Sequence, residues 1–201
     1  CYAISKDGGI TWEQSNGKKY ELPITQETAE IAWEIPQKSS LINQTSMVVD
    51  KEGVPYIATY WNNDKSPQYK VVYLKDKQWK LLNTDFRKSS FYLGGGGTKR
   101  IPISRPKIII DSERIHLLFR DEERGNKILL ASTLKNSIQW NLKEISKESV
   151  GQWEPNYDVD LWEKEKVLHI FSQKVTQLDG EGVSETEPQP IKIIQIKNIA
   201  D

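Results

Sequence analysis

Two arginines near the middle of the chain are placed where they could bind a carboxylate. Arg105 stands at the start of an apolar run, and Arg120 ends the next one. A guanidinium presents parallel N–H groups that match both oxygens of a carboxylate. The alternative for Arg105 is a salt bridge to a neighbouring acid such as Asp121 or Glu123. Arg124 follows in the same loop, where it is either a solvated charge or a further substrate-binding group.

Aromatic and amide side chains occupy similar positions, at the ends of apolar runs. Tyr60, Tyr157 and Trp153 could stack on a sugar ring or pack between structural units. Amides in the same loops suit hydrogen bonds to sugar hydroxyl groups. The candidates for substrate binding are therefore Asn43, Gln44, Trp61, Trp153, Gln173 and Arg124.

Three loop carboxylates are candidates for acid–base chemistry. Glu123, Glu154 and Asp158 could serve a glycoside hydrolase, which needs two carboxylates about 5 to 10 Å apart. His116 and His169 are the only histidines in the chain, and their positions are more typical of strand or core residues.

Metal and cofactor chemistry has little support in the sequence. No cluster of cysteine and histidine supports a zinc site, so we expect no cofactor. The stretch 179–182, Asp-Gly-Glu-Gly, could bind calcium, but an exposed acidic loop is the more ordinary interpretation.

Composition restricts the classes of partner. The 201 residues carry 28 basic and 28 acidic side chains, and a zero net charge argues against nucleic acid as the main partner. No apolar run approaches the roughly 20 residues of a membrane span. Seven Trp and eight Tyr favour strands and suit stacking on sugars. Cys1, the single cysteine, cannot form an internal disulfide.

The elements that would position these residues begin with a tight turn at 5–12. The stretch reads S-x-D-x-G-x-T-W, with Ser5, Asp7, Gly9 and Trp12 at its defining positions. Asp7 can accept hydrogen bonds from turn N–H groups, and glycine permits a positive φ. Trp12 begins the return strand. We interpret this turn as structural, not catalytic.

Short strands separated by polar turns then repeat along the chain. A tryptophan opens the fourth strand of each repeat at Trp12, Trp79 and Trp140, so the period is about 60 to 70 residues. The repeats span 1–14, 46–83, 105–144 and 157–196. The strands expected after the first repeat are 46–50, 54–60, 69–74, 79–82, 105–111, 115–120, 127–132, one from Trp140, 158–162, 167–173 and 190–196.

Four antiparallel strands per repeat indicate an all-β fold, a β-propeller of four-stranded blades. A β-sandwich is the alternative. The chain accounts for roughly three blades, too few to close a ring, so we expect it to be the C-terminal half of a larger propeller. Loops after each second strand and between blades should converge on one face, where function usually lies.

The turn at 5–12 matches the Asp box, or BNR repeat, at its defining positions. The runs 103–106, 119–124 and 153–155 resemble a bacterial BNR-repeat family of the putative neuraminidase type. That family is similar to seven-bladed lyases that act on uronate-containing polysaccharides such as ulvan, and to related rhamnosidases. The resemblance implies a seven-bladed propeller whose other half would be a partner of this chain.

The resemblance also implies a chemistry, β-elimination beside a uronic acid. Arg105 or Arg120 would neutralise the carboxylate, and Tyr157 or Tyr60 would take the C5 proton. A glycoside hydrolase and a non-catalytic glycan-binding propeller remain the alternatives. Each predicts an oligosaccharide or polysaccharide partner. We expect secretion or a periplasmic location, with a signal peptide upstream of this stretch.

Overall fold

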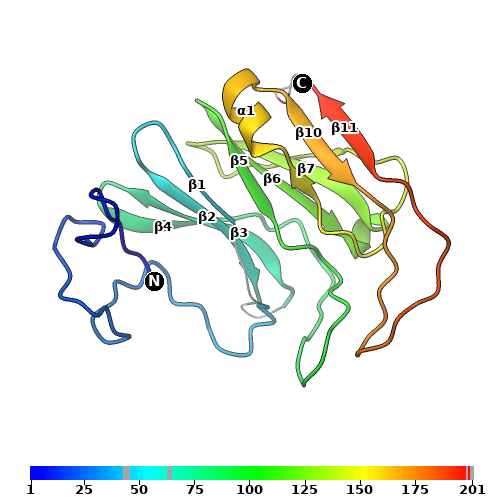
Figure 1. Ribbon diagram of the computed structural model, residues 1–201, viewed down its shortest axis with the longest axis horizontal. Helices are drawn as coiled ribbons and strands as arrows, with labels where there is room; N and C mark the ends of the chain where they lie inside the picture. Colours follow the sequence, from blue (N-terminus) through cyan, green and yellow to red (C-terminus); the bar gives the residue numbers. More distant parts are fainter. Residues whose placement is uncertain (43–45, 63–64, 198, 200–201) are drawn as a thin grey trace.

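The computed structural model describes residues 1–42, 46–62, 65–197 and 199. These residues form three antiparallel sheets, arranged in chain order across the molecule (Figure 1). The first sheet has the order β1-β2-β3-β4, the second β5-β6-β7-β8 and the third β11-β10-β9. Their bounds are β1 Ser46–Val49, β2 Pro55–Trp61, β3 Gln68–Lys75, β4 Gln78–Asn83, β5 Lys107–Ile110, β6 Arg114–Asp121, β7 Lys127–Leu134, β8 Asn141–Glu144, β9 Asn156–Tyr157, β10 Leu168–Ser172 and β11 Lys192–Ile196.

The eight strands expected in the two middle repeats are confirmed, with their ends shifted by a few residues. Alternation explains why they form. In β2, Tyr56, Ala58 and Tyr60 enter the core shared with the second sheet, whereas Ile57 and Trp61 face the N-terminal segment. A period of two residues places successive side chains on opposite faces of a sheet. Because both faces of β2 are covered, nearly all of its residues are buried.

The strand expected at 158–162 is wrong, because this stretch begins the helix α1, Val159–Glu165. The Asp158 side chain caps the helix by accepting a hydrogen bond from Leu161 N at 3.0 Å. At the other end Lys166 adopts a left-handed conformation, with φ of 57°. The first strand of the third sheet is instead the two-residue β9.

The N-terminal segment contains the turn expected at 5–12. Thr11 donates from N and Oγ1 to the two oxygens of Asp7, at 2.9 and 2.7 Å, and Gly9 N donates to Ser5 Oγ at 2.7 Å. The Trp12 indole N–H donates to the Gly9 carbonyl at 3.1 Å. The two bonds from Thr11, with a further bond from the Ser5 hydroxyl, lower the pKa of Asp7 to about 2. The strands expected on either side are reduced to single bridges, such as Ile4 with Glu13.

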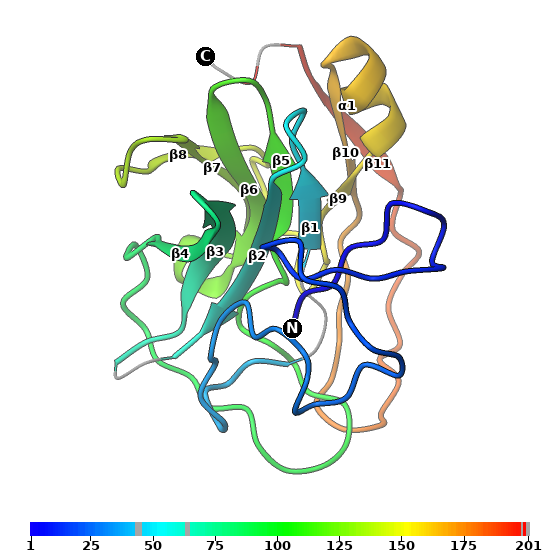
Figure 2. The same cartoon turned by 90° about the vertical axis from the view of Figure 1, so that its left-hand side faces the viewer.

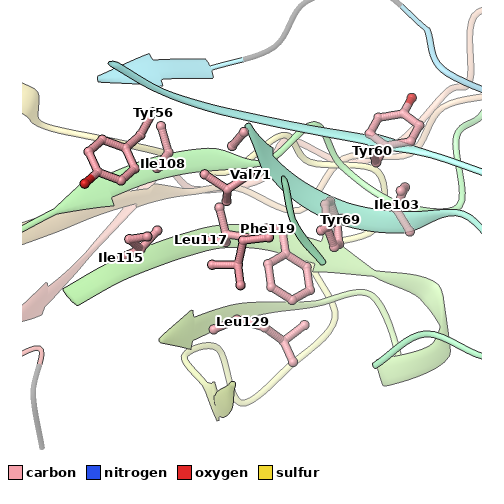
Figure 3. Packing of buried hydrophobic residues seen from close by; sticks show 13 residues of the cluster. Tyr56, Tyr60, Tyr69, Val71, Ile103, Ile108, Ile115, Leu117, Phe119 and Leu129 are labelled. Atoms are coloured by element: carbon pink, nitrogen blue, oxygen red, sulfur yellow. The ribbon is translucent and has the colours of Figure 1, made fainter. Parts of the chain in front are cut away.

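Neighbouring sheets pack face to face through two main apolar cores. The first core joins the first and second sheets, where the rings of Tyr69 and Phe119 lie 4.5 Å apart (Figure 3). The second core joins the second and third sheets around Leu118, Ile128 and Trp162. Sequential four-stranded meanders packed in this way have the arrangement of propeller blades. The described residues do not close a ring.

Two of the three recurring tryptophans bond to an earlier part of the chain. The Trp140 indole N–H donates to the Asn83 carbonyl at 3.1 Å, across the interface between the second and first sheets. Trp79 donates to the Glu30 carboxylate at 2.9 Å, in the segment before the first sheet. An indole N–H shielded from water requires a partner, and for Trp79 and Trp140 a preceding part of the chain supplies it. Trp12 differs, because its indole bonds within its own turn.

Candidate functional site

The loops that follow β2 and β6 and the connections between sheets gather at one end of the molecule. We call this end the loop face; it comprises residues 62, 65–67, 84–106, 122–126, 145–155 and 173–191. In both cartoon views the long connections at 84–106 and 173–191 extend from the end opposite α1 (Figures 1 and 2). Val150 N donates to the Asn126 carbonyl at 2.8 Å, and Gly180 N donates to the Thr98 carbonyl at 2.8 Å. Loops of different sheets thus support one another.

Arg105 forms an ion pair with Glu154 on the loop face. Glu154 Oε2 accepts from Arg105 N at 2.9 Å and from Arg105 Nε at 3.3 Å. The two side chains are 33% and 34% exposed. Burial raises the pKa of the Tyr60 hydroxyl; the hydrogen bond from Ile42 N and the charge of Arg105 oppose this rise, and the charge of Glu154 adds to it. The salt bridge expected to Asp121 or Glu123 is therefore made to Glu154 instead.

Arg120 is buried and holds the loop face together from inside. Its guanidinium donates to the carbonyls of Trp153 at 3.2 Å, Pro102 at 3.1 Å and Ile101 at 2.9 Å, and to Asn126 Oδ1 at 2.8 Å. These bonds use four of the five N–H groups of the side chain. Arg120 therefore positions loops, and its guanidinium does not face solvent beside Arg105.

A second cluster of charged side chains lies next to these loops. Only two of its four members, Glu123 and Arg124, were candidates from the sequence. We call Arg87, Asp121, Glu123 and Arg124 the Asp121 cluster. Asp121 is fully buried and accepts from Arg87 Nε at 2.9 Å and from Arg124 NH1 at 3.1 Å. Burial raises the pKa of Glu123, but N–H groups of Ser89 and Lys88 and the charge of Arg87 outweigh it, so the pKa is lowered.

A hollow of about 320 Å³ opens beside the Asp121 cluster. Phe91 and Pro102 supply its apolar lining, and the Arg87 guanidinium lies 5.3 Å from the centre of the Phe91 ring. Its volume is at the low end of the range for small-molecule sites, which is about 300 to 1,000 Å³. The complete lining is Arg87, Ser89, Ser90, Phe91, Pro102, Glu122 and Glu123.

The aromatic candidates all contribute to packing. Tyr60 and Trp61 are buried in the cores on either side of β2, and Tyr60 Oη accepts from Ile42 N at 3.3 Å. Tyr157 is buried, donates to the Ile108 carbonyl at 3.2 Å, and has its pKa raised to about 12, chiefly by burial. The Trp153 indole donates to the Phe171 carbonyl at 2.8 Å. Of the two interpretations, sugar stacking or packing, these contacts correspond to packing.

The remaining polar candidates are dispersed. Asp158 caps α1, at the end opposite the loop face, so it does not join Glu123 and Glu154. Gln173 Nε2 donates to the Gln189 carbonyl at 2.9 Å within the last connection. Asn43 and Gln44 lie outside the described residues.

Histidine and carboxylate groups elsewhere have structural partners. His116 is buried, with Nδ1 2.7 Å from Ser132 Oγ and Nε2 3.1 Å from Asp111 Oδ2, at the end opposite the loop face. In the acidic stretch 179–182, Asp179 accepts from Arg100 N at 2.7 Å and Glu181 from Thr98 N at 3.0 Å. Within the described part of the chain, no group of three or more His, Cys, Asp or Glu could hold a metal ion.

Sequence reasoning missed two residues of the loop face. Arg87 lies between strands with no apolar pattern around it, and its signal was only its charge beside Phe86 and Phe91. Tyr92, which is 72% exposed, follows the hollow residue Phe91. Both belong to the long connection at 84–106, whose course only the fold determines.

The N-terminal part of the chain is similar to a known protein family. Residues 1–87 match the family model described as BNR repeat-containing family member. This match supports a BNR-repeat protein and agrees with the turn at 5–12 and the antiparallel sheets. No curated protein matches the chain. In the described residues, no helix has the length and apolar character needed to cross a membrane.

Proposed function

We propose that this chain forms part of a carbohydrate-active β-propeller, a polysaccharide lyase whose loop face binds a uronate-containing polysaccharide. The observation that carries the proposal is the partly exposed ion pair of Arg105 and Glu154, just before β5. Glu154 orients the guanidinium by binding both its Nε and the backbone N–H of Arg105. An arginine held in this way is suited to a sugar carboxylate.

The propeller would be a larger one, seven-bladed, in which these sheets form the C-terminal half. Support comes from the sequential packing of the sheets and from the BNR-repeat match. The other half would complete the mouth of the central channel. A polysaccharide substrate would place the protein outside the cytoplasm, in the periplasm or the medium.

The reaction would be β-elimination. A base removes the C5 proton beside the carboxylate, the C4–O bond breaks, a C4–C5 double bond forms, and the leaving oxygen takes a proton. Arg105 would neutralise the carboxylate and so acidify the C5 proton. Tyr60 and Tyr157 are buried, so Tyr92 is the tyrosine of this face with an exposed side chain among the described residues. We propose Tyr92 as the base that removes the C5 proton.

The experiment uses the full-length protein on a panel of uronate-containing polysaccharides, with ultraviolet absorbance and reducing ends followed together. Elimination raises both signals, because the new double bond absorbs. Reducing ends without absorbance would replace the lyase with a hydrolase. Binding without either signal would leave a glycan-binding propeller.

Variants then test the residues. Arg105→Ala should lower kcat by about a hundredfold, as removal of one charge-stabilising group does. Arg105→Lys should recover part of the activity, because the charge returns without the paired N–H groups. Tyr92→Phe should remove activity and leave binding intact. The control is Lys51→Ala, an exposed cation in the β1–β2 turn at the opposite end of the sheets.

A further inference from the structure

The hollow on the loop face has a character different from that of the Arg105 site. Phe91 and Pro102 supply its apolar lining, and Ser89 and Ser90, which also line it, are exposed. An apolar lining with a few hydroxyl and carboxylate groups is typical of a site for a small polar ligand. The faces of a pyranose ring carry C–H groups that pack on apolar side chains, while its hydroxyls reach the polar groups around them.

The arginine in the hollow does not make it an anion site. Arg87 donates to the Asp121 carboxylate, to the Pro67 carbonyl at 3.0 Å and to the Ser89 carbonyl at 3.2 Å. Its NH2 also donates to Asp121 Oδ1 at 3.3 Å and lies 3.4 Å from Glu123 Oε1. The guanidinium is committed to protein atoms and has a side-chain exposure of only 1%.

The charge that remains at the hollow is negative. Within the Asp121 cluster, the two carboxylates are balanced by the two guanidiniums, which contact them directly. Glu122 is a further lining residue outside this balance, and it is exposed. Its backbone N–H donates to the Pro102 carbonyl at 2.9 Å, which fixes it at the rim. A uronate would meet this charge, whereas an uncharged sugar could donate a hydroxyl to it.

One side chain, that of Arg120, fixes the position of the hollow relative to the Arg105 site. Arg120 donates to the carbonyl of Pro102, in the hollow, and to that of Trp153, the neighbour of Glu154. Pro102 also precedes Arg105 by three residues, so their Cα atoms are at most about 11 Å apart. Neighbouring sugars of one polysaccharide could therefore occupy the hollow and the Arg105 site together.

We infer that the hollow is a subsite for an uncharged pyranose residue of the same glycan whose uronate is bound at Arg105. This inference rests on the proposed function and adds to it a substrate class, a polysaccharide in which charged and uncharged sugars adjoin. Glu122 is the residue that determines specificity, since it rejects a second uronate. Ser90 and Phe91 supply contact without charge.

The test compares two probes with the same ring, methyl β-D-glucopyranoside and methyl β-D-glucopyranosiduronate. They are titrated into the full-length, 15N-labelled protein, and the amide signals of Ser90, Phe91 and Arg105 are followed by NMR. The glucoside should shift the Ser90 and Phe91 signals and bind there about fivefold more tightly than the uronate, as expected for one nearby charge. The uronate should shift the Arg105 signal.

Two variants on exposed side chains keep the fold and test the mechanism. Ser90→Ala should weaken the glucoside about fivefold, the effect of one lost hydrogen bond. Glu122→Gln should bring the two probes to within about twofold of each other at the hollow, because the repulsion is gone. Glu52→Gln, an exposed acid in the β1–β2 turn, is the matched control and should change neither ratio.

The outcomes separate the two proposals. The inference is overturned if the uronate shifts the hollow signals as strongly as the glucoside, or if neither probe shifts them at its solubility limit. It is also overturned if Glu122→Gln leaves the preference unchanged. If the glucoside binds the hollow while the uronate leaves Arg105 unaffected, the subsite stands and the proposed carboxylate site fails. The reverse result removes the subsite alone.

Discussion

Replacing Asp121 by asparagine should destabilise the protein strongly, because two arginines depend on this buried carboxylate. Asp121 is fully buried and accepts from Arg87 Nε at 2.9 Å, from Arg124 NH1 at 3.1 Å and from Glu123 N at 3.0 Å. Breaking a buried ion pair by removing one partner costs about 3 to 5 kcal/mol. Arg87 keeps Glu123 and two carbonyls as partners, so we expect the lower end, about 3 kcal/mol.

Urea unfolding of the full-length protein measures this loss. With a slope of about 2 to 3 kcal/mol per molar urea, the midpoint should fall by roughly 1 to 1.5 M. Arg87→Met should cost a similar amount, since it leaves Asp121 with less compensation. The double variant should lose about 2 kcal/mol less than the two single losses added together, because the groups are in direct contact.

A surface ion pair provides the matched control. Lys127 and Glu144 lie 2.7 Å apart, with side chains 31% and 56% exposed. Lys127→Met and Glu144→Gln should each cost less than about 1 kcal/mol. The reasoning fails if Asp121→Asn is no more destabilising than these variants, or if the Arg87 and Asp121 losses simply add.

Three further predictions concern other parts of the sheets. The pKa of Asp111 is lowered from 3.8 to about 2 because the hydrogen bond from His116 and two backbone N–H groups outweigh the effect of burial, so stability present above pH 4 should be lost as pH falls through 2. Urea midpoints at both pH values should therefore differ less in Asp111→Asn than in the unaltered protein. Trp140→Phe should cost about 1 kcal/mol through loss of its bond to the neighbouring sheet, and a larger or absent effect in thermal unfolding would contradict this. Gly151→Ala should cost more than about 1 kcal/mol, since φ is 59° and the new Cβ would lie 2.0 Å from the Val175 carbonyl oxygen; equal melting temperatures would refute it.

The strands were predictable because their signals are local. Apolar residues alternate in stretches such as Pro55–Trp61, and short polar turns such as 51–53 separate them. The two middle sheets follow from these patterns alone. The helix α1 was missed because its stretch is short and apolar residues suggested a strand, although Asp158 three residues before Leu161 is a helix-capping signal.

The candidate site was less predictable, because burial and pairing are set by distant segments. Arg105 was identified from its position, but its partner Glu154 lies 49 residues further along the chain. Arg120 was expected beside it, yet the carbonyls of two separate loops surround its guanidinium. The hollow joins residues from the connection at 84–106 with the loop after β6. The pattern of residues along the sequence does not show which distant segments come into contact.

The contacts between sheets also bear on how far the repeats can differ in sequence. Trp140 and Trp162 from their indole N–H, and Tyr157 from its hydroxyl, each donate to a main-chain carbonyl of the preceding sheet. Every residue type presents a carbonyl, so the acceptor survives any substitution that preserves the strand. One repeat can therefore change its side chains without a matching change in its neighbour. Such one-sided contacts let the sequences of neighbouring repeats differ widely while the packing between their sheets is kept.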